Sequence, residues 1–178
     1  SAYKNLNNRM KNGDVVLIDG GIGSELELRG VPMNSDAWCG VASEQHRGIL
    51  EKIHCDYIEA GADIITANTY ASSGLMLANS GFGDRIREIN MNAIEVAKQG
   101  RERMRKEGGV AIAGSLSHMV PLSEGTAMED SGKLPNDVEI AAAYHELARI
   151  LAASGCQLII LEMMYHPKRV RLALDAAL

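Results

Sequence analysis

The sequence predicts an α/β fold built from four consecutive strand–helix units, and two observations support this. Four short apolar runs recur along the 178 residues, at positions 15–19, 64–68, 110–115 and 158–162. None alternates cleanly between apolar and polar residues, which indicates strands that are covered on both faces of a parallel sheet. Longer segments with apolar residues at helical spacing separate these runs, as expected for βαβ units with right-handed crossovers.

The first unit joins a strand at 15–19 to a helix that is expected over 44–60. The strand ends in Asp19 and continues into a glycine-rich turn with the sequence DGGIGS. Ser43 is a suitable N-cap for the helix. The apolar face of that helix is predicted to consist of Leu50, Ile53 and Tyr57.

The second and third units repeat the pattern. The strand at 64–68 is followed by a helix expected over 85–107, whose apolar stripe comprises Ile86, Ile89, Ala93, Val96 and Met104. A helix over 137–154 follows the third strand, with Ala141, Tyr144, Ala148 and Leu151 on its buried side. A long polar loop, 118–137, precedes it, and such loops often shape binding sites.

The fourth unit pairs the strand at 158–162 with a helix that begins near Pro167, a residue suited to a first helical turn. The three later junctions resemble one another. Gly61, Gly108 and Gly155 each precede a strand and are expected to close a helix in the left-handed conformation. Seven positions after each glycine comes a polar residue, which is Asn68, Ser115 and Glu162 in turn.

Four such units fit two architectures: a small doubly wound sheet, or the first half of a (β/α)₈ barrel, which typically needs about 250 residues. The sequence ends inside a helical pattern, LALDAAL, with no stop signal. We therefore expect a partial barrel of the TIM type. Residues 1–178 would then be the N-terminal half of one barrel domain.

Composition excludes several classes of function. The chain is 46% hydrophobic and 23% charged, with a net charge of −5, which does not indicate a surface for nucleic acid or an anionic membrane. No apolar stretch is long enough for a membrane span, so we expect a cytoplasmic protein. The cysteines Cys39, Cys55 and Cys156 are widely spaced, which predicts reduced structural thiols rather than disulfides or a zinc site of their own.

Ligands of parallel α/β proteins bind where the strands end, and the four predicted strands end in Asp19, Asn68, Ser115 and Glu162. Two carboxylates suit an ammonium group. Backbone N–H groups of the turn after Asp19, at Gly20 and Gly21, suit a carboxylate. An amino acid carries both groups, although each polar residue could simply cap its strand.

The glycine-rich turn does not match the common phosphate-binding motifs. A P-loop ends in Gly-Lys followed by Ser or Thr, and no lysine occurs here. The dinucleotide pattern Gly-x-Gly-x-x-Gly begins at Gly21 and Gly23 but has Leu26 at the position of its third glycine. His118 and His166 also follow strands and could act as acid–base groups, with roles that stay open.

Several segments together resemble the homocysteine S-methyltransferases. LIDGGIGSELELRG resembles the family's opening motif of an apolar strand, Asp-Gly-Gly/Ala-x-Gly-Ser/Thr, a Leu and a later Gly. AWCG resembles the Leu-Trp-Ser segment that follows it. YIEAGADIITANTYASS, VAIAGSLS and LIILEMM are similar to the second, third and fourth strand motifs, the last with its terminal Glu162. The matches extend over most of the chain, from about residue 14 to residue 164.

The resemblance implies a (β/α)₈ barrel that transfers a methyl group from a small donor to the sulfur of homocysteine, which yields methionine. The donor differs by subgroup: S-methylmethionine, S-adenosylmethionine, betaine, or methyl-folate through cobalamin. Residues matching Asp19 and Glu162 help to hold the homocysteine amino group, and the turn at Gly20 and Gly21 lies at the amino-acid end. Asn68 and Ser115 match positions at the rim of the site.

The resemblance also implies a Zn²⁺ ion held by three cysteines, which come later in the family than the last residue of this chain. We therefore carry no metal ligand over to this sequence and expect the 178-residue chain alone to be inactive. Two other readings stay open. One is a different barrel enzyme, a lyase or aldolase with Glu162 as general base; the other is a non-catalytic amino-acid-binding half-barrel. A half-barrel would expose sheet edges, so a homo-oligomer is possible.

Overall fold

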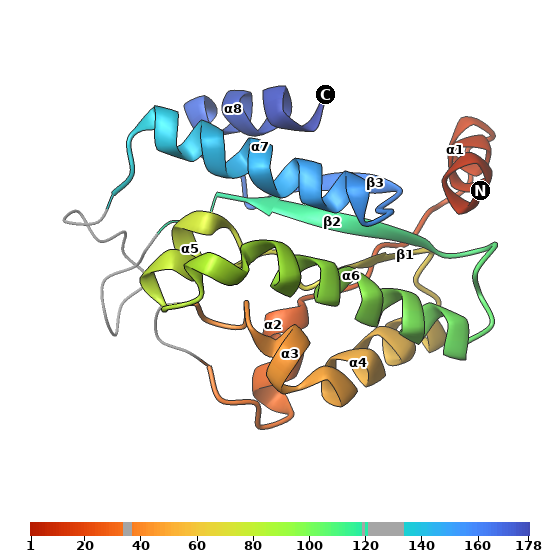
Figure 1. The fold of residues 1–178 in the computed structure, drawn as a ribbon. Helices are drawn as coiled ribbons and strands as arrows, with labels where there is room; N and C mark the ends of the chain where they lie inside the picture. Colours follow the sequence, from red (N-terminus) through yellow and green to blue (C-terminus); the bar gives the residue numbers. More distant parts are fainter. Residues whose placement is uncertain (34–36, 119, 121–133) are drawn as a thin grey trace.

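The computed structural model describes residues 1–33, 37–118, 120 and 134–178, and its centre is a parallel sheet (Figure 1). The strands are β1 (Ile64–Thr66), β2 (Ala111–Ser117) and β3 (Leu158–Glu162). They lie side by side in the order β1-β2-β3, and both neighbouring pairs are parallel. The predicted α/β class and parallel sheet are confirmed.

The segment at 15–19 is less regular than predicted. It runs parallel to β1 but forms only one bridge, between Ile18 and Ile64, with backbone bonds from Asp63 and Ile64 to the Leu17 carbonyl. The backbone N–H of Leu17 instead donates to the Asp63 carboxylate, which replaces a ladder bond. Side chains on this outer edge are exposed, and Val15 is 74% exposed.

The sheet shows no reversal of strand order among the described residues. The bridge at Ile18, β1, β2 and β3 follow one another in space as they do along the chain. Right-handed crossovers between successive neighbours place the connecting helices on the same face. A doubly wound sheet needs a reversal of order to cover both faces, so this arrangement fits a singly wound sheet.

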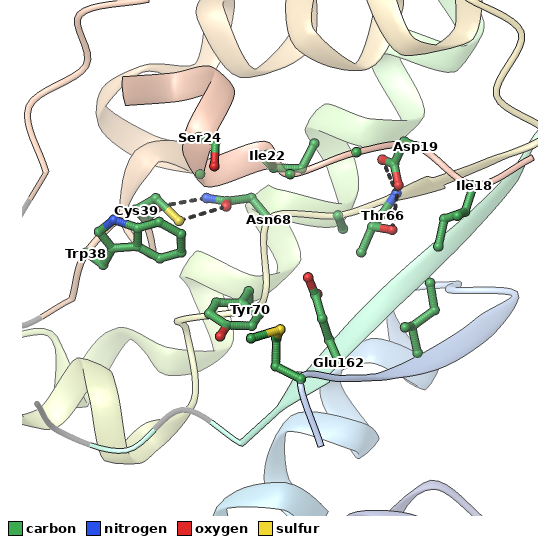
Figure 2. A pocket seen from close by; sticks show the side chains of 16 residues that line it. Ile18, Asp19, Ile22, Ser24, Trp38, Cys39, Thr66, Asn68, Tyr70 and Glu162 are labelled. Atoms are coloured by element: carbon green, nitrogen blue, oxygen red, sulfur yellow. Dashed lines mark hydrogen bonds between the residues drawn. The ribbon is translucent and has the colours of Figure 1, made fainter. Parts of the chain in front are cut away.

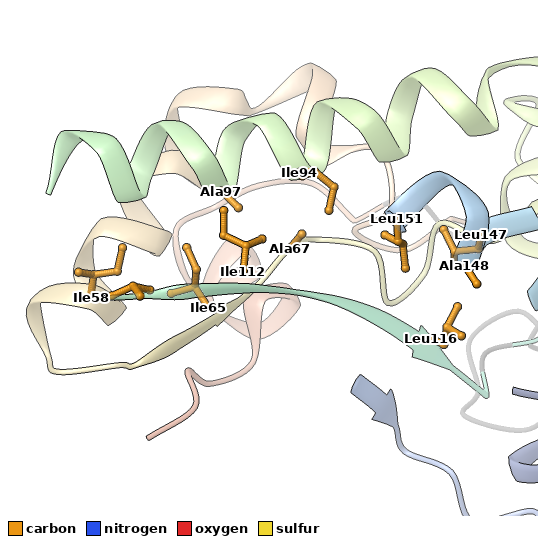
Figure 3. Packing of buried hydrophobic residues seen from close by; sticks show 11 residues of the cluster. Ile58, Ile65, Ala67, Ile94, Ala97, Ile112, Leu116, Leu147, Ala148 and Leu151 are labelled. Carbon is orange, nitrogen blue, oxygen red and sulfur yellow. The ribbon is translucent and has the colours of Figure 1, made fainter. Parts of the chain in front are cut away.

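The helices α4 (Arg47–Glu59), α6 (Ile86–Arg103) and α7 (Asp137–Ala153) pack on that one face, and α8 (Pro167–Ala177) packs beside α7. The main core lies between them and the sheet (Figure 3). The helices contribute Ile58, Ile94, Ala97, Leu147, Ala148 and Leu151, and the sheet side contributes Ile65, Ala67, Val110, Ile112 and Leu116. Because side chains alternate along a strand, the intervening strand residues face the other way.

The opposite face of the sheet is closed at its N-terminal end by α1 (Ala2–Lys11). Ala2 and Leu6 pack against Ala111 of β2 and against the partly buried Ile64 and Leu158 at the starts of the other strands. Arg9 fixes the helix there, because its guanidinium binds both oxygens of Asp63 at 2.5 and 3.2 Å. The carboxyl ends of the strands, on the same face, are left for a ligand.

One predicted helix start differs from the structure. The helix expected over 44–60 is divided into α3 (Ala42–Gln45) and α4 by a break at His46. Ser43 is therefore not the N-cap. It lies inside α3, fully buried, and its hydroxyl donates to the carbonyl of Ile89 at 3.1 Å. In contrast, α7 begins where predicted, because Asn136 forms a capping box with Glu139.

The glycine caps are confirmed at Gly61 (φ 105°) and Gly155 (φ 88°), but Gly108 is not among the residues with positive φ. The reason is that α6 ends at Arg103, four residues before the predicted end at 107. Arg105 (φ 54°) adopts the left-handed conformation in place of the glycine. The sequence patterns did not predict α1, α2 (Ile22–Leu28), α5 (Gly74–Asn79) or the short η1 (Gly83–Arg85).

Most of the predicted loop at 118–137 lies outside the described residues. No helix among the described residues is long and apolar enough to cross a membrane. The three cysteines are free thiols, with Cys39 and Cys55 buried.

A histidine without a hydrogen bond is buried between α4 and α6. His54 is 0% exposed, and neither ring nitrogen has a partner. Its Cβ lies beside Gly100, which gives α6 room to approach. Burial lowers the pKa of His54 from 6.5 to about 4, so the ring is neutral in the folded protein. An unpaired polar ring in such a core is a cost to stability.

We expect His54→Leu to raise the free energy of unfolding by about 1–3 kcal/mol, because it removes a buried group that lacks a partner. In the native chain, the unfolded state binds a proton at His54 below about pH 6.5, whereas the folded state does so only below about pH 4. Stability should therefore fall by about 1.4 kcal/mol per pH unit in that window, and the variant should lose this dependence. Urea denaturation across pH measures both effects.

The control for this prediction is His145→Leu at a partly exposed histidine of α7. It should change the free energy of unfolding by no more than about 0.5 kcal/mol near neutral pH. A His54→Leu protein that is less stable than the native chain at every pH would show that the ring packs better than its missing bonds suggest.

Candidate functional site

A cavity of about 510 Å³ lies at the carboxyl ends of the strands, on the face opposite the main helices. It is bounded by the turn after the 15–19 segment, the start of α2, the 38–39 segment, the end of β1 and the end of β3 (Figure 2). Thr66, Ile160 and Glu162 reach it because they alternate with the strand residues that face the helices. This is the position that parallel α/β proteins use for ligands.

Asp19 enters the cavity from the turn that follows the edge segment. Its Oδ2 accepts the backbone N–H of Thr66 at 2.7 Å, and its Oδ1 accepts the Thr66 hydroxyl at 2.8 Å. Burial raises the pKa of Asp19 to about 6, the two bonds from Thr66 oppose this, and the charge of Glu162 adds a smaller increase. The carboxylate is therefore ionised at neutral pH but close to titration.

Glu162, the last residue of β3, points into the same cavity from the other edge of the sheet (Figure 2). Its Oε2 accepts the hydroxyl of Ser115 at 2.7 Å. Ser115 itself is 0% exposed and is not among the residues that line the cavity. The Ser115 hydroxyl therefore affects the cavity only indirectly, through its hydrogen bond to the Glu162 carboxylate.

Asn68 lines the cavity, but its amide is already bonded to the segment at Cys39. Nδ2 donates to the Cys39 carbonyl at 2.7 Å, and Oδ1 accepts the Cys39 thiol at 3.5 Å. Burial raises the pKa of Cys39 to about 12, so this sulfur is a neutral thiol. Asn68 therefore fixes one wall of the cavity.

That wall presents Trp38, whose ring meets Tyr70 edge-on with centroids 5.7 Å apart. Together with Met163 these residues form an apolar side of the cavity. Trp38 (φ 46°) and Met163 (φ 55°) adopt the left-handed backbone region despite their side chains. Such strain is common where the surrounding structure holds residues in place for binding.

The glycine-rich turn packs tightly on its neighbours. A Cβ at Gly20 would lie 2.7 Å from the hydroxyl oxygen of Tyr57, and one at Gly23 would overlap the ring of Trp38. The Tyr57 hydroxyl also donates to the Gly21 carbonyl at 3.5 Å. Glycine lets these two rings pack directly on the turn, which accounts for the motif without a phosphate.

Of the residues predicted to form the site, Asp19, Gly20, Gly21, Asn68 and Glu162 all line this one cavity. Ser115 lies behind it. His118 and His166 do not line it. The carbonyl of His118 accepts a bond from Arg169, and His166 is exposed ahead of α8.

The sequence patterns missed Thr66, because the strand was expected to end at Asn68. The structure ends β1 at Thr66, and strand alternation from Ile64 places Thr66 on the cavity side. Tyr70 and Met163 were also missed. Each residue closely follows the end of a strand, so its position in the motif TANTY or LEMM could have predicted that it lines the cavity.

The electrostatics of the cavity favour a cation. Two carboxylates face it, and no lysine, arginine or histidine is among the described residues that line it. Within the described part of the chain, no group of three His, Cys, Asp or Glu side chains could hold a metal ion. The residues present fit an ammonium group and do not fit a zinc site.

Comparisons with known proteins identify the relatives of this chain. A family profile described as homocysteine S-methyltransferase matches residues 16–178. The chain is 28% identical to homocysteine S-methyltransferase 4 of Zea mays over 164 residues, which is 84% of this chain and 47% of that protein. It is also 28% identical to the selenocysteine methyltransferase of Astragalus bisulcatus over 172 residues, or 84% of this chain and 50% of that protein.

Among solved structures, the chain resembles the metallated form of the homocysteine methyltransferase MmuM from Escherichia coli. The TM-score is 0.74 at 19% identity, over 94% of this chain and 60% of that one, which shows a shared fold. The chain spans about half the length of the curated relatives it matches. On the profile match over nearly its whole length, the chain belongs to the homocysteine S-methyltransferase family.

Proposed function

We propose that this chain is the homocysteine-binding part of a homocysteine S-methyltransferase. Residues 1–178 would form the first four βα units, the N-terminal half, of a single (β/α)₈ barrel domain. The observation that carries the proposal is the pair of carboxylates, Asp19 and Glu162, that face one cavity. None of the described residues that line this cavity is cationic. Two further observations support the proposal: the strands of the sheet lie side by side in the order in which they occur along the chain, and the chain belongs to the family.

In this proposal the ammonium group of homocysteine lies between Asp19 and Glu162, where charge-assisted hydrogen bonds are strong. Backbone N–H groups of the turn at Gly20 and Gly21 receive the carboxylate, since glycine lets a ligand approach the main chain closely. Ser115 contributes by orienting Glu162, and Asn68 by fixing the Cys39 wall. The apolar side at Trp38 and Met163 accepts the methylene chain and sulfur.

Methyl transfer needs the sulfur as a thiolate, and a Zn²⁺ ion supplies that form by lowering the pKa of a bound thiol. The metallated MmuM crystal shows that a relative binds metal. Here the described residues offer no such ligand set, and Cys39 is a buried neutral thiol. A zinc site would need ligands beyond the described residues, so we assign none and expect this chain to bind homocysteine without methylating it.

The methyl donor would be one of the small molecules that the family uses: S-methylmethionine, S-adenosylmethionine, betaine or methyl-folate through cobalamin. No described contact selects among them. The likeness to selenocysteine methyltransferases makes selenocysteine a second acceptor to test, because it carries the same ammonium and carboxylate groups. A lyase or aldolase using a lysine is disfavoured, since no described residue lining the cavity is a lysine.

Calorimetric titration with L-homocysteine tests the proposal, with the analogue that lacks the amino group as the matched ligand. Binding of homocysteine and an affinity for the analogue at least about 100-fold weaker would support it, because a charged hydrogen bond contributes about 1.5–3 kcal/mol. Equal affinity for both would show that the carboxylates do not recognise the ammonium group.

The pH dependence of this binding is a separate prediction. Asp19, with a pKa of about 6, loses its charge as the pH falls through that value, while the ligand's amino group stays protonated. Affinity should be nearly constant between about pH 8 and pH 7 and then decline by up to about tenfold per unit below pH 6. Titrations over this range measure it, and an affinity that rises on acidification would contradict the assignment.

A further inference from the structure

One residue holds both oxygens of the Asp19 carboxylate. The backbone N–H of Thr66 donates to Oδ2 at 2.7 Å, and its side-chain hydroxyl donates to Oδ1 at 2.8 Å (Figure 2). Thr66 is 8% exposed and lines the cavity. Two bonds from one residue of a strand fix both the position and the plane of the carboxylate.

A related pair, joined by a hydroxyl bond alone, occurs toward the other edge of the sheet. Thr66 on β1 donates to Asp19 on the neighbouring edge segment, and Ser115 on β2 donates to Glu162 on the neighbouring β3. In each pair an inner strand supplies the hydroxyl and an outer segment supplies the acid. A carboxylate can accept about four hydrogen bonds, so each retains sites for a ligand.

The surroundings of Asp19 otherwise oppose its charge. Burial disfavours the ionised form, and Glu162 on β3 faces it across the cavity as a second acid. Tyr57 on α4 is also near Asp19, and the pKa of its phenol is raised mainly by burial, with smaller contributions from the charges of Glu25 and Asp19. The bonds from Thr66 are the main opposing influence, because hydrogen bonds donated to a carboxylate favour its ionised form.

We propose that Thr66 is a positioning residue: its hydroxyl holds the Asp19 carboxylate charged and oriented into the cavity, where it receives the ammonium group of the ligand. The identity of the ligand in this proposal rests on the proposed function. The effect of Thr66 on the Asp19 carboxylate is independent of the ligand, because it is a property of the empty site.

Thr66→Val tests the proposal, since valine keeps the shape and the backbone N–H and removes only the hydroxyl. Thr66→Ser restores the hydroxyl. Thr69→Val is the matched control: this threonine is also buried, but its hydroxyl bonds to the backbone of Ser115 and to neither carboxylate. All three are made in the whole chain and checked for folding by thermal denaturation.

The first measurement is an NMR titration of the Asp19 carboxyl carbon without ligand. We expect its midpoint to rise by about one pH unit in Thr66→Val, to return toward the native value in Thr66→Ser, and to stay unchanged in Thr69→Val. The second is titration with L-homocysteine near pH 6, where Thr66→Val should bind about fivefold more weakly, because a one-unit rise lowers the ionised fraction of Asp19 from about one half to about one tenth. The deficit should shrink at higher pH.

An unchanged Asp19 midpoint in Thr66→Val would overturn the proposal, even if homocysteine binds the native chain. A raised midpoint that Thr66→Ser reverses would support it, even if homocysteine binds none of the proteins, in which case the proposed ligand is wrong. Equal shifts in Thr66→Val and Thr69→Val would also overturn it, because the effect would then be a general loosening of the buried hydroxyls.

Discussion

Replacing Asp19 with asparagine is expected to weaken the binding of L-homocysteine by about 100-fold at neutral pH, and Glu162→Gln by a similar factor. Each change is isosteric and removes one of the two charges that face the cavity. A hydrogen bond to a charged partner contributes about 1.5–3 kcal/mol, which corresponds to about 10- to 150-fold in affinity. The asparagine must also turn a donor toward Thr66, which offers two donors of its own.

Calorimetry with homocysteine measures the loss, and Asp84→Asn is its control. Asp84 is an exposed acid in η1 that does not line the cavity, so its replacement alters net charge by the same amount and should leave affinity unchanged. Neither site variant should unfold the chain, because each removes an acid from a partly buried position. Native affinity in both Asp19→Asn and Glu162→Gln would exclude the pair as the ammonium site.

The sequence was most informative where its signals are local. Apolar runs placed β1, β2 and β3 within two residues of their structural bounds, and the capping box at Asn136 has a recognisable pattern. The 15–19 segment looked like its neighbours, yet it forms a single bridge. Whether a segment pairs with its neighbour over its full length depends on the residues along the edge of the neighbouring strand. An apolar run in the segment itself does not reveal this.

The site shows the same limit. That Asp19 and Glu162 line one cavity could be predicted, because the carboxyl ends of parallel strands lie at the same edge of a sheet. The different roles of the hydroxyls could not: Ser115 is hidden behind Glu162, and Thr66 faces the cavity. Whether a polar residue of a strand reaches a cavity depends on where the strand ends. In the same way, the role of Ser43 depends on where its helix begins, and its hydroxyl donates to a backbone carbonyl of α6 instead of capping a helix.

Gly40→Ala is expected to lower the free energy of unfolding by about 3 kcal/mol. A Cβ at this position would overlap the carbonyl oxygen of Ala71 and lie 3.0 Å from that of Ala37. Both obstacles are backbone, so no side-chain rotation can relieve them. The melting temperature should drop by roughly 6–12 °C for a chain of this size.

The matched control is Gly48→Ala near the start of α4, where a new Cβ meets nothing within 4 Å. Alanine is the better helix former, so this change should be neutral or stabilise by about 0.5–1 kcal/mol.

The position of Gly40 connects this stability effect with the site. It directly follows Cys39, whose carbonyl and thiol are bonded to Asn68, and Trp38, whose ring forms the cavity wall. Moving the segment away from Ala71 would break the Asn68 bonds and shift Trp38, so Gly40→Ala should also weaken homocysteine binding where folded protein remains. A variant that kept native stability would show that the 37–40 segment can move freely, and the cavity would then have no fixed wall on that side.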